Sequence, residues 1–134
     1  KYHIIRATLE SIAYQVCDVA DAMKADSGID LRTLKVDGGA SANDLLMQFQ
    51  ADMLNKPVNR PSCVESTGMG ASFLAGLATG FWKNKEELLR TITLDRVFIP
   101  NMDEEERNKK RKGWNKAVKY AYGWAKDNED EEEE

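Results

Sequence analysis

The stretch LKVDGGASANDLLMQFQAD, residues 34–52, joins an alternating segment to a helix-like segment through two adjacent glycines. Leu34 and Val36 alternate with polar residues, and this pattern predicts a short strand. Glycine tolerates positive φ and lets a ligand or another backbone come close. Gly38 and Gly39, at a strand-to-helix junction, therefore favour either a tight turn or a cradle for the phosphates of a nucleotide.

A helix is predicted after the glycines. Ser41 is a candidate N-cap, and Asp44, three residues later, can return the contact as in a capping box. Lys56 and Pro57 stop the helix. The residues that recur at helical spacing, and that we expect to face the core, are Leu46, Phe49 and Met53.

A longer amphipathic helix is predicted before this stretch, from His3 to about Lys24, with Gly28 as a left-handed cap. One row of large apolar residues recurs at steps of four and three: Ile5, Leu9, Ile12, Val16, Val19 and Met23. A second row, Ala13, Cys17 and Ala20, widens the face that we expect to be buried.

Two further segments follow the central helix. PVNRP, residues 57–61, is bounded by prolines and predicts an edge strand. In STGMGASFLAGLATGFW, residues 66–82, a small residue falls at every fourth position: Gly68, Ser72, Gly76 and Gly80. The run is too short for a membrane span, so we expect this ridge to pack tightly onto the sheet.

The last third of the chain predicts a short helix in KEELLRTI (residues 85–92), a strand in RVFIP (96–100) and a helix capped by Asp103. The first turn of the helix capped by Asp103 is acidic and the following turns are basic, which suits the helix dipole and i,i+4 pairing. The expected inward stripe of that helix is Trp114, Ala117, Ala121 and Trp124. Residues 127–134 read as an acidic disordered tail.

Helices and strands alternate along the chain, which predicts an α/β fold with helices packed on a short mixed sheet. The net charge of −4 argues against a nucleic-acid partner. Cys17 and Cys63 have no metal-ligand or redox spacing, and His3 is the only histidine, so no metal site and no catalytic residue is predicted. Lacking a signal sequence or an apolar membrane span, the chain is expected to be cytoplasmic.

Two motifs resemble the carboxy-terminal lobe of the FGGY family of carbohydrate kinases: DGGASANDLLMQFQADMLNKPVNRP (residues 37–61) and ESTGMGASFLAGLATGFW (residues 65–82). HIIRATLE, residues 3–10, is similar to the end of that family's second signature. The resemblance runs from about Lys1 to Trp124. The DGGA and MQFQAD segments are similar to the branch of the family that phosphorylates glycerol.

The resemblance implies a partial ribonuclease-H-like lobe of the actin-like ATPase type, formed by residues 1–126 and incomplete at its amino-terminal side. In this family ATP lies between two lobes. Gly39, with Gly38 before it, would bring its backbone against the nucleotide near the ribose and α-phosphate. Asn43 would form a hydrogen bond with the nucleoside. The alternative that Gly39 only makes a turn and Asn43 only caps a helix stays open.

The implied reaction is transfer of the ATP γ-phosphate to glycerol, giving glycerol 3-phosphate, with Mg²⁺ held mainly by the nucleotide and by residues outside this chain. The implied partners are ATP, glycerol and the rest of the same kinase chain. Because the first helix would lack part of its sheet, we expect exposed apolar surface and a homo-oligomer. The chain alone is expected to be inactive. The alternatives are a kinase for another polyol or sugar, and a non-catalytic module that binds proteins.

Overall fold

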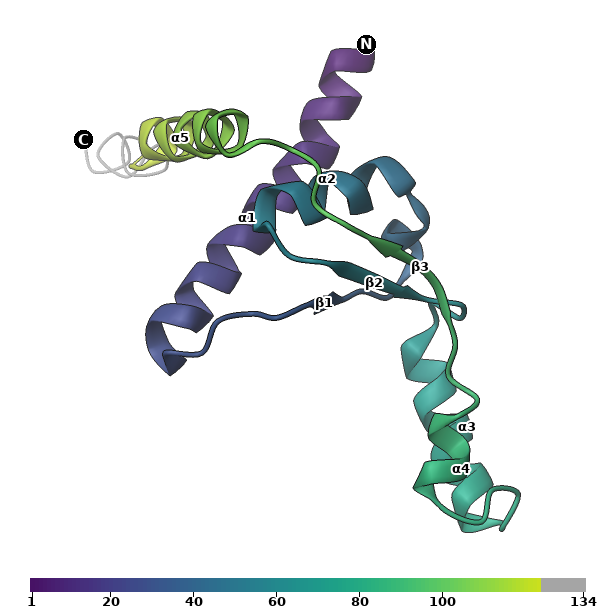
Figure 1. Cartoon of the computed structure of the whole chain (residues 1–134). Coiled ribbons are helices and arrows are strands. Elements are labelled where there is room, and N and C mark those ends of the chain that lie inside the picture. Colours follow the sequence, from purple (N-terminus) through teal and green to yellow (C-terminus); the bar gives the residue numbers. More distant parts are fainter. Residues whose placement is uncertain (124–134) are drawn as a thin grey trace, which may run out of the picture. The chain divides into compact units, whose positions relative to one another are not determined.

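The computed structural model describes residues 1–123, and Figure 1 shows the arrangement of their helices and strands. The predicted order of elements is confirmed, with one added 3₁₀ turn, η1. The elements are α1 (Tyr2–Ser27), β1 (Leu34–Lys35), η1 (Gly39–Ala42), α2 (Asp44–Leu54), β2 (Val58–Pro61), α3 (Ser66–Ala78), α4 (Lys85–Leu89), β3 (Leu94–Phe98) and α5 (Glu104–Ala121). The expected tail at 127–134 and Trp124 lie outside the described residues.

The chain divides into two compact units, and the first, Lys1–Asn101, contains the sheet. The strand order is β1-β2-β3, with β1 parallel to β2 and β2 antiparallel to β3. The prediction that residues 57–61 form an edge strand is wrong, because β2 is central. The sheet tolerates these prolines because Pro57 precedes the strand and Pro61 lies where the register with β3 shifts.

Helices α1 and α2 pack against each other through small side chains. Ala13 and Cys17 on α1 are fully buried. The side-chain amide of Gln50 donates to the Ala13 carbonyl oxygen at 3.3 Å. Beside this contact, the rings of Tyr14 and Phe49 meet edge to face, with centroids 5.5 Å apart. The second, small-residue row of α1 therefore forms the close contact.

The larger row of α1, which was expected to face the core, is mostly exposed. Ile5, Ile12, Val19 and Met23 are exposed, and Leu9 and Val16 are half-buried. Small residues let the helix axes approach closely, and the large side chains then lie at the flanks of the contact. The expectation that this stripe is buried is wrong, whereas exposed apolar surface on the first helix agrees with the prediction.

The sequence correctly predicted the C-cap of α1 and the N-cap of α5. Gly28 adopts the left-handed conformation, with φ 69°, and its N–H donates to the Lys24 carbonyl oxygen at 2.9 Å. The side chain of Asp103 accepts from the Glu106 N–H at 2.8 Å, which confirms it as the N-cap of α5. The predicted stripe of α2, Leu46, Phe49 and Met53, is buried. Within the described residues no residue of α5 is buried, and the inward stripe expected for this helix stays a prediction.

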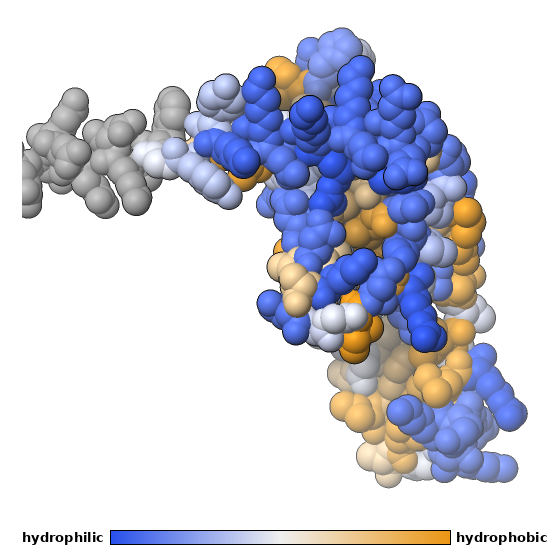
Figure 2. All heavy atoms as spheres, turned by 60° about the vertical axis from the view of Figure 1, so that its left-hand side comes forward, coloured by the Kyte–Doolittle hydropathy of each residue, from blue (hydrophilic) through white to orange (hydrophobic). Residues whose placement is uncertain are grey.

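Helix α3 does not pack tightly onto the sheet as predicted, because none of its residues is buried. Figure 2 shows hydrophobic atoms at the surface in the lower part of the molecule, where Figure 1 places α3 and α4. Leu74 on α3 and Phe81 after it are among the exposed large apolar residues. The small residues of α3 serve a different contact, at Gly76. There the indole ring of Trp82, which also meets Phe73 edge to face, lies against the glycine.

Replacement of Gly76 by alanine is expected to displace the Trp82 ring, because a Cβ at this position would overlap Cζ3 and Cε3 of the indole. Overpacking typically costs about 1–3 kcal/mol, which outweighs the roughly 1 kcal/mol that alanine adds to helix stability. Urea unfolding and the NMR signal of the Trp82 indole N–H measure the two effects. Gly70→Ala is the matched control, since a Cβ there meets nothing within 4 Å. Equal stability of the two variants would contradict the contact.

Candidate functional site

The candidate site lies at the edge of the sheet where β1 and β2 end. Because these strands are parallel, the segments leading into α2 and α3 leave from the same edge. Beyond β1, the Val36 N–H still donates to the Asn59 carbonyl oxygen at 3.2 Å. The Gly38 N–H donates to the Val64 carbonyl oxygen at 2.7 Å, which ties the glycine turn to the segment after β2.

Gly38 has a conformation that only glycine adopts without strain, with φ 78° and ψ 167°. Its carbonyl oxygen accepts from both the Ser41 N–H, at 3.1 Å, and the Ser41 Oγ, at 2.7 Å. The turn that the sequence predicted at this position is therefore present. Glycine is required at position 38 because other residues adopt this backbone conformation only with strain.

Gly39 differs from Gly38, because it begins η1 and its φ is not positive. A Cβ built on Gly39 would meet no protein atom within 4 Å. Among the described residues we find no acceptor for its backbone N–H, as expected for the first residue of a helical turn. The fold itself thus gives no reason for glycine at position 39, and the space beside it is open.

Asn43, not Ser41, is the N-cap of α2. Its Oδ1 accepts from the Leu46 N–H at 3.1 Å, whereas Ser41 is buried and its hydroxyl points back to Gly38. The predicted capping box of Ser41 and Asp44 is wrong, because η1 intervenes and delays the helix by two residues. Capping occupies only the oxygen of the Asn43 amide. Its Nδ2 carries two further donors at an exposed position, four residues after Gly39 in the chain.

Arg60 on β2 belongs to the site, and sequence reasoning missed it. Its Nη1 donates to the Ser41 carbonyl oxygen at 2.9 Å and to Asp44 Oδ1 at 2.8 Å. Its Nε and Nη2 both lie 2.7 Å from Asp95 Oδ2. Hydrogen bonds to Asp44 and then to Asp95 raise the pKa of the guanidinium, which stays charged. An arginine next to a proline in a strand carries no local signal for these contacts, which join three separate segments.

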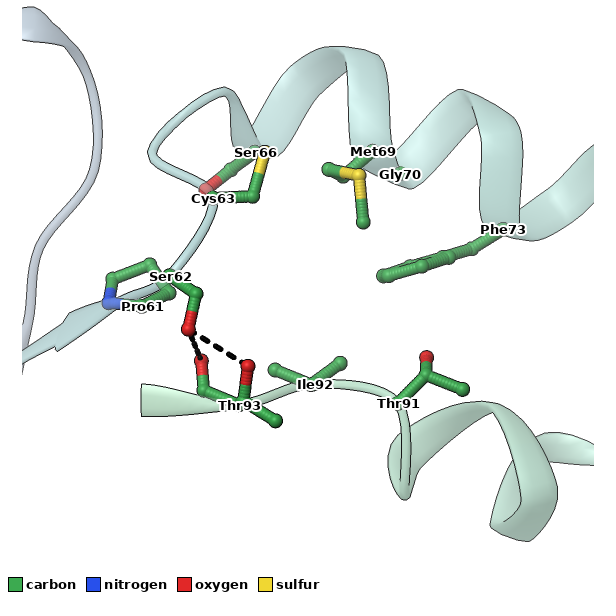
Figure 3. Close-up of a pocket in the computed structure, with 10 residues that line it drawn as sticks. All are labelled: Pro61, Ser62, Cys63, Ser66, Met69, Gly70, Phe73, Thr91, Ile92 and Thr93. Atoms are coloured by element: carbon green, nitrogen blue, oxygen red, sulfur yellow. Dashed lines mark hydrogen bonds between the residues drawn. The ribbon is translucent and has the colours of Figure 1, made fainter. Parts of the chain in front are cut away.

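A pocket of about 210 Å³ opens near the same edge, between the start of α3 and the segment before β3 (Figure 3). Met69, Phe73 and Ile92 supply its apolar side chains. At its end, the Ser62 and Thr93 hydroxyls lie 2.7 Å apart and share a hydrogen bond. Gly38, Gly39 and Asn43 do not line this pocket, so it is separate from the glycine turn.

The part of the chain that the structure describes contains neither a metal-binding cluster nor a membrane-spanning helix. No group of three or more His, Cys, Asp or Glu side chains there could hold a metal ion. Within residues 1–123, every helix is too short or too polar to cross a bilayer. Cys17 is buried and Cys63 exposed, and both are thiols.

The chain is similar over nearly its whole length to bacterial proteins named glycerol kinase. It is 64% identical to that of Agathobacter rectalis over 127 residues, which are 95% of this chain and 26% of the relative. It is 62% identical to that of Aeromonas hydrophila over 125 residues, which are 93% of this chain and 25% of the relative. The chain thus spans about a quarter of the length of the curated relatives it matches.

Solved structures extend the likeness to three dimensions. A crystal structure of Plasmodium falciparum glycerol kinase with ADP matches with a TM-score of 0.76 and 38% identity, over 90% of this chain and 24% of that one. Xylulose kinase from Lactobacillus acidophilus matches with a TM-score of 0.71 over 91% of this chain and 24% of that one, at 23% identity, and supports the fold alone. The predicted α/β fold of the actin-like ATPase type is confirmed.

The family comparison covers the whole of the first motif and all but the last three residues of the second. The match to the carboxy-terminal domain extends over residues 1–79, more than half of the chain, and it includes the glycine turn and α2. The resemblance inferred from the motifs is confirmed, and the chain belongs to the FGGY family of carbohydrate kinases.

Proposed function

We propose that this chain is the carboxy-terminal, nucleotide-binding part of a glycerol kinase, which transfers the γ-phosphate of ATP to glycerol and gives glycerol 3-phosphate. The observation that carries the proposal is the open turn at Gly39, in a chain 38% identical to a glycerol kinase crystallised with ADP. The identities of 62–64% to bacterial glycerol kinases support glycerol as the acceptor over other polyols and sugars.

In this proposal Gly39 places its backbone against the ribose and α-phosphate. Its N–H is free to donate to an anionic oxygen, and the absence of a side chain leaves room for the nucleotide. Asn43 donates from Nδ2 to the nucleoside while its Oδ1 keeps the start of α2 in place. The role as a cap and the role in binding are then compatible, because they use different atoms of one amide.

Phosphoryl transfer also requires a base for the acceptor hydroxyl and groups that hold the β- and γ-phosphates with Mg²⁺. No group of three or more His, Cys, Asp or Glu side chains among the described residues could hold a metal ion, and in this proposal Mg²⁺ is held mainly by the nucleotide and by residues outside this chain. We therefore assign to this chain only the adenosine end of ATP. The base, the acceptor pocket and the metal ligands belong to the remaining three quarters of a relative's length.

A chimera tests the proposal directly. In it, this chain replaces the matching carboxy-terminal quarter of the Agathobacter rectalis glycerol kinase, to which it is 64% identical. We expect the chimera to phosphorylate glycerol with a kcat/KM within about tenfold of the parent enzyme. The measurement is a coupled assay of ADP release with glycerol and MgATP. A folded chimera that neither binds ADP nor phosphorylates glycerol would contradict the proposal.

The 134-residue chain by itself is expected to show no glycerol-dependent ADP release, because it lacks the acceptor pocket and the base. Turnover above background would contradict this assignment. A titration with ADP, followed by NMR, separates a nucleotide role from a protein-binding module. Shifts at Gly39 and Asn43 support the nucleotide role, and no response at millimolar ADP supports the module.

Two further properties belong to the same proposal. A cytoplasmic location is consistent with two cysteine thiols, which are typical of a reducing compartment, and with ATP as the phosphoryl donor. A homo-oligomer is consistent with the exposed apolar row of α1, which includes Ile5, Val19 and Met23. Sedimentation velocity of the 134-residue chain at high concentration measures self-association through this surface, and a compact, stable monomer would contradict it.

A further inference from the structure

The glycine turn is held in place by few contacts of its own. Its internal bonds join Ser41 to the Gly38 carbonyl oxygen, and the Gly38 N–H ties it to Val64. At the far end, the Asn43 N–H donates to the Ala40 carbonyl oxygen at 3.2 Å, and the Asn43 carbonyl oxygen accepts from the Met47 N–H at 3.0 Å. These bonds stay within the turn and α2, so they do not tie this end to the sheet. The group that reaches this end from the sheet is the side chain of Arg60.

Arg60 contacts both sides of Asn43. Nη1 lies 2.9 Å from the carbonyl oxygen of Ser41, two residues before Asn43, and 2.8 Å from Oδ1 of Asp44, the residue after it. The side chain of Arg60 is only 11% exposed, and its guanidinium lies over the ring of Phe98 on β3, 5.1 Å from the centroid. Arg60 extends from the central strand of the sheet, so it links the end of the turn to the core.

The remaining donors of Arg60 are bound on its other side. Nε and Nη2 both lie 2.7 Å from Oδ2 of Asp95. The guanidinium group is therefore held between the carboxylates of Asp95 and Asp44. A planar fork of five donors can bond a backbone carbonyl and two carboxylates at once. A lysine ammonium at the same place is a point charge on a flexible stem and cannot keep that set of directions.

Arg96 offers an internal comparison. It lies over the same Phe98 ring, 4.6 Å from the centroid, and its Nη1 donates to Oδ2 of Asp44 at 2.6 Å. It thus shares the ring and the carboxylate with Arg60. The structure gives it no bond to the Ser41 carbonyl oxygen, which only Arg60 reaches among the described side chains.

We propose that Arg60 is a positioning residue for the nucleotide turn: it holds Ser41 and Asp44 and thereby sets where Asn43 lies relative to Gly39. The inference rests on the proposed function, since it concerns the same nucleotide contacts. Arg60 does not touch the nucleotide in this scheme. It acts through the Ser41 carbonyl oxygen and the first turn of α2.

The test compares Arg60→Lys with Arg96→Lys in the chimera defined above. Loss of the charge-assisted contacts of Arg60 is expected to raise the KM for ATP about tenfold, with the KM for glycerol unchanged. Arg96→Lys is expected to leave the KM for ATP within about twofold, because the turn keeps its bond to Arg60. Thermal unfolding of each variant shows what share of any change is loss of folded protein.

A second measurement reports the position of Asn43 in the absence of nucleotide. In the isotope-labelled 134-residue chain, Arg60→Lys is expected to shift the side-chain amide signal of Asn43 before any ADP is added, whereas Arg96→Lys leaves it in place. Equal effects of the two substitutions on the KM for ATP would overturn the inference, as would an unaltered KM in a folded Arg60→Lys chimera. If the unsubstituted chimera does not bind ADP, the proposed function fails and the inference fails with it.

Discussion

Replacement of Gly39 by valine is expected to lower nucleotide affinity at least about 100-fold, or roughly 2.7 kcal/mol, while the protein stays folded. Gly39 has an ordinary backbone conformation, and a Cβ there meets no protein atom within 4 Å. The protein therefore tolerates a side chain, but a nucleotide against this backbone does not. Valine is chosen because its branched Cβ is stiff and cannot rotate out of the way.

The measurements are the ADP dissociation constant of the chimera and its thermal unfolding midpoint. Gly38→Val provides the contrasting control. Gly38 has φ 78° and ψ 167°, so any side chain strains its backbone by about 1–3 kcal/mol, and this variant is expected to lose stability. The proposal for Gly39 is contradicted by unchanged ADP affinity in the valine variant. It is also contradicted by a loss of stability at Gly39 as large as that at Gly38.

Replacement of Phe98 by alanine is expected to lower the free energy of unfolding by about 3–5 kcal/mol. Phe98 is 2% exposed and ranks first by volume among the fully buried side chains of the described residues. It pairs with Val58 across the sheet, and its ring supports the guanidinium groups of Arg60 and Arg96. Its removal leaves a cavity and takes away the ring against which the guanidinium groups of Arg60 and Arg96 lie.

Urea unfolding of the 134-residue chain measures this loss. Because domains are typically stable by about 5–15 kcal/mol, a change of this size removes much of the total. Phe81→Ala is the matched control: Phe81 is 76% exposed and its ring forms a T-shaped pair with Trp82, with centroids 4.9 Å apart, so the expected loss is below about 1 kcal/mol. Similar losses in the two variants would show that Phe98 is not the core residue that the structure describes.

Most features that depend on near neighbours in the chain were predictable. The cap of α2 is an exception, since the Leu46 N–H donates to Asn43 and the sequence had favoured Ser41. The left-handed cap at Gly28 and the N-cap at Asp103 follow from residues within one helical turn. The stripe of α2 and the order of the elements follow from periodicity, which is also local. The family could also be inferred from the sequence, because the residues of the DGGASAND motif are consecutive.

Features that depend on a partner segment were not predictable. The central place of β2, between β1 and β3, depends on strands more than twenty residues away in each direction. The choice between the two apolar rows of α1 depends on the small residues that α2 meets, Ala13 and Cys17. The expected packing of α3 failed because small residues permit a close neighbour but do not specify which one, and here the neighbour is Trp82.

In the candidate site, too, local features were predictable and features that depend on distant segments were not. The sequence by itself determined that Gly38, Gly39 and Asn43 lie together between a strand and a helix, because all three occur within six residues. Only the tertiary structure decided that Gly38 is needed for its backbone and Gly39 is not, and that Asn43 is the cap. It also decided that Arg60 holds the turn. The physical reason is that conformational preference is local, whereas burial, hydrogen-bond partners and free space are created by segments that meet only after folding.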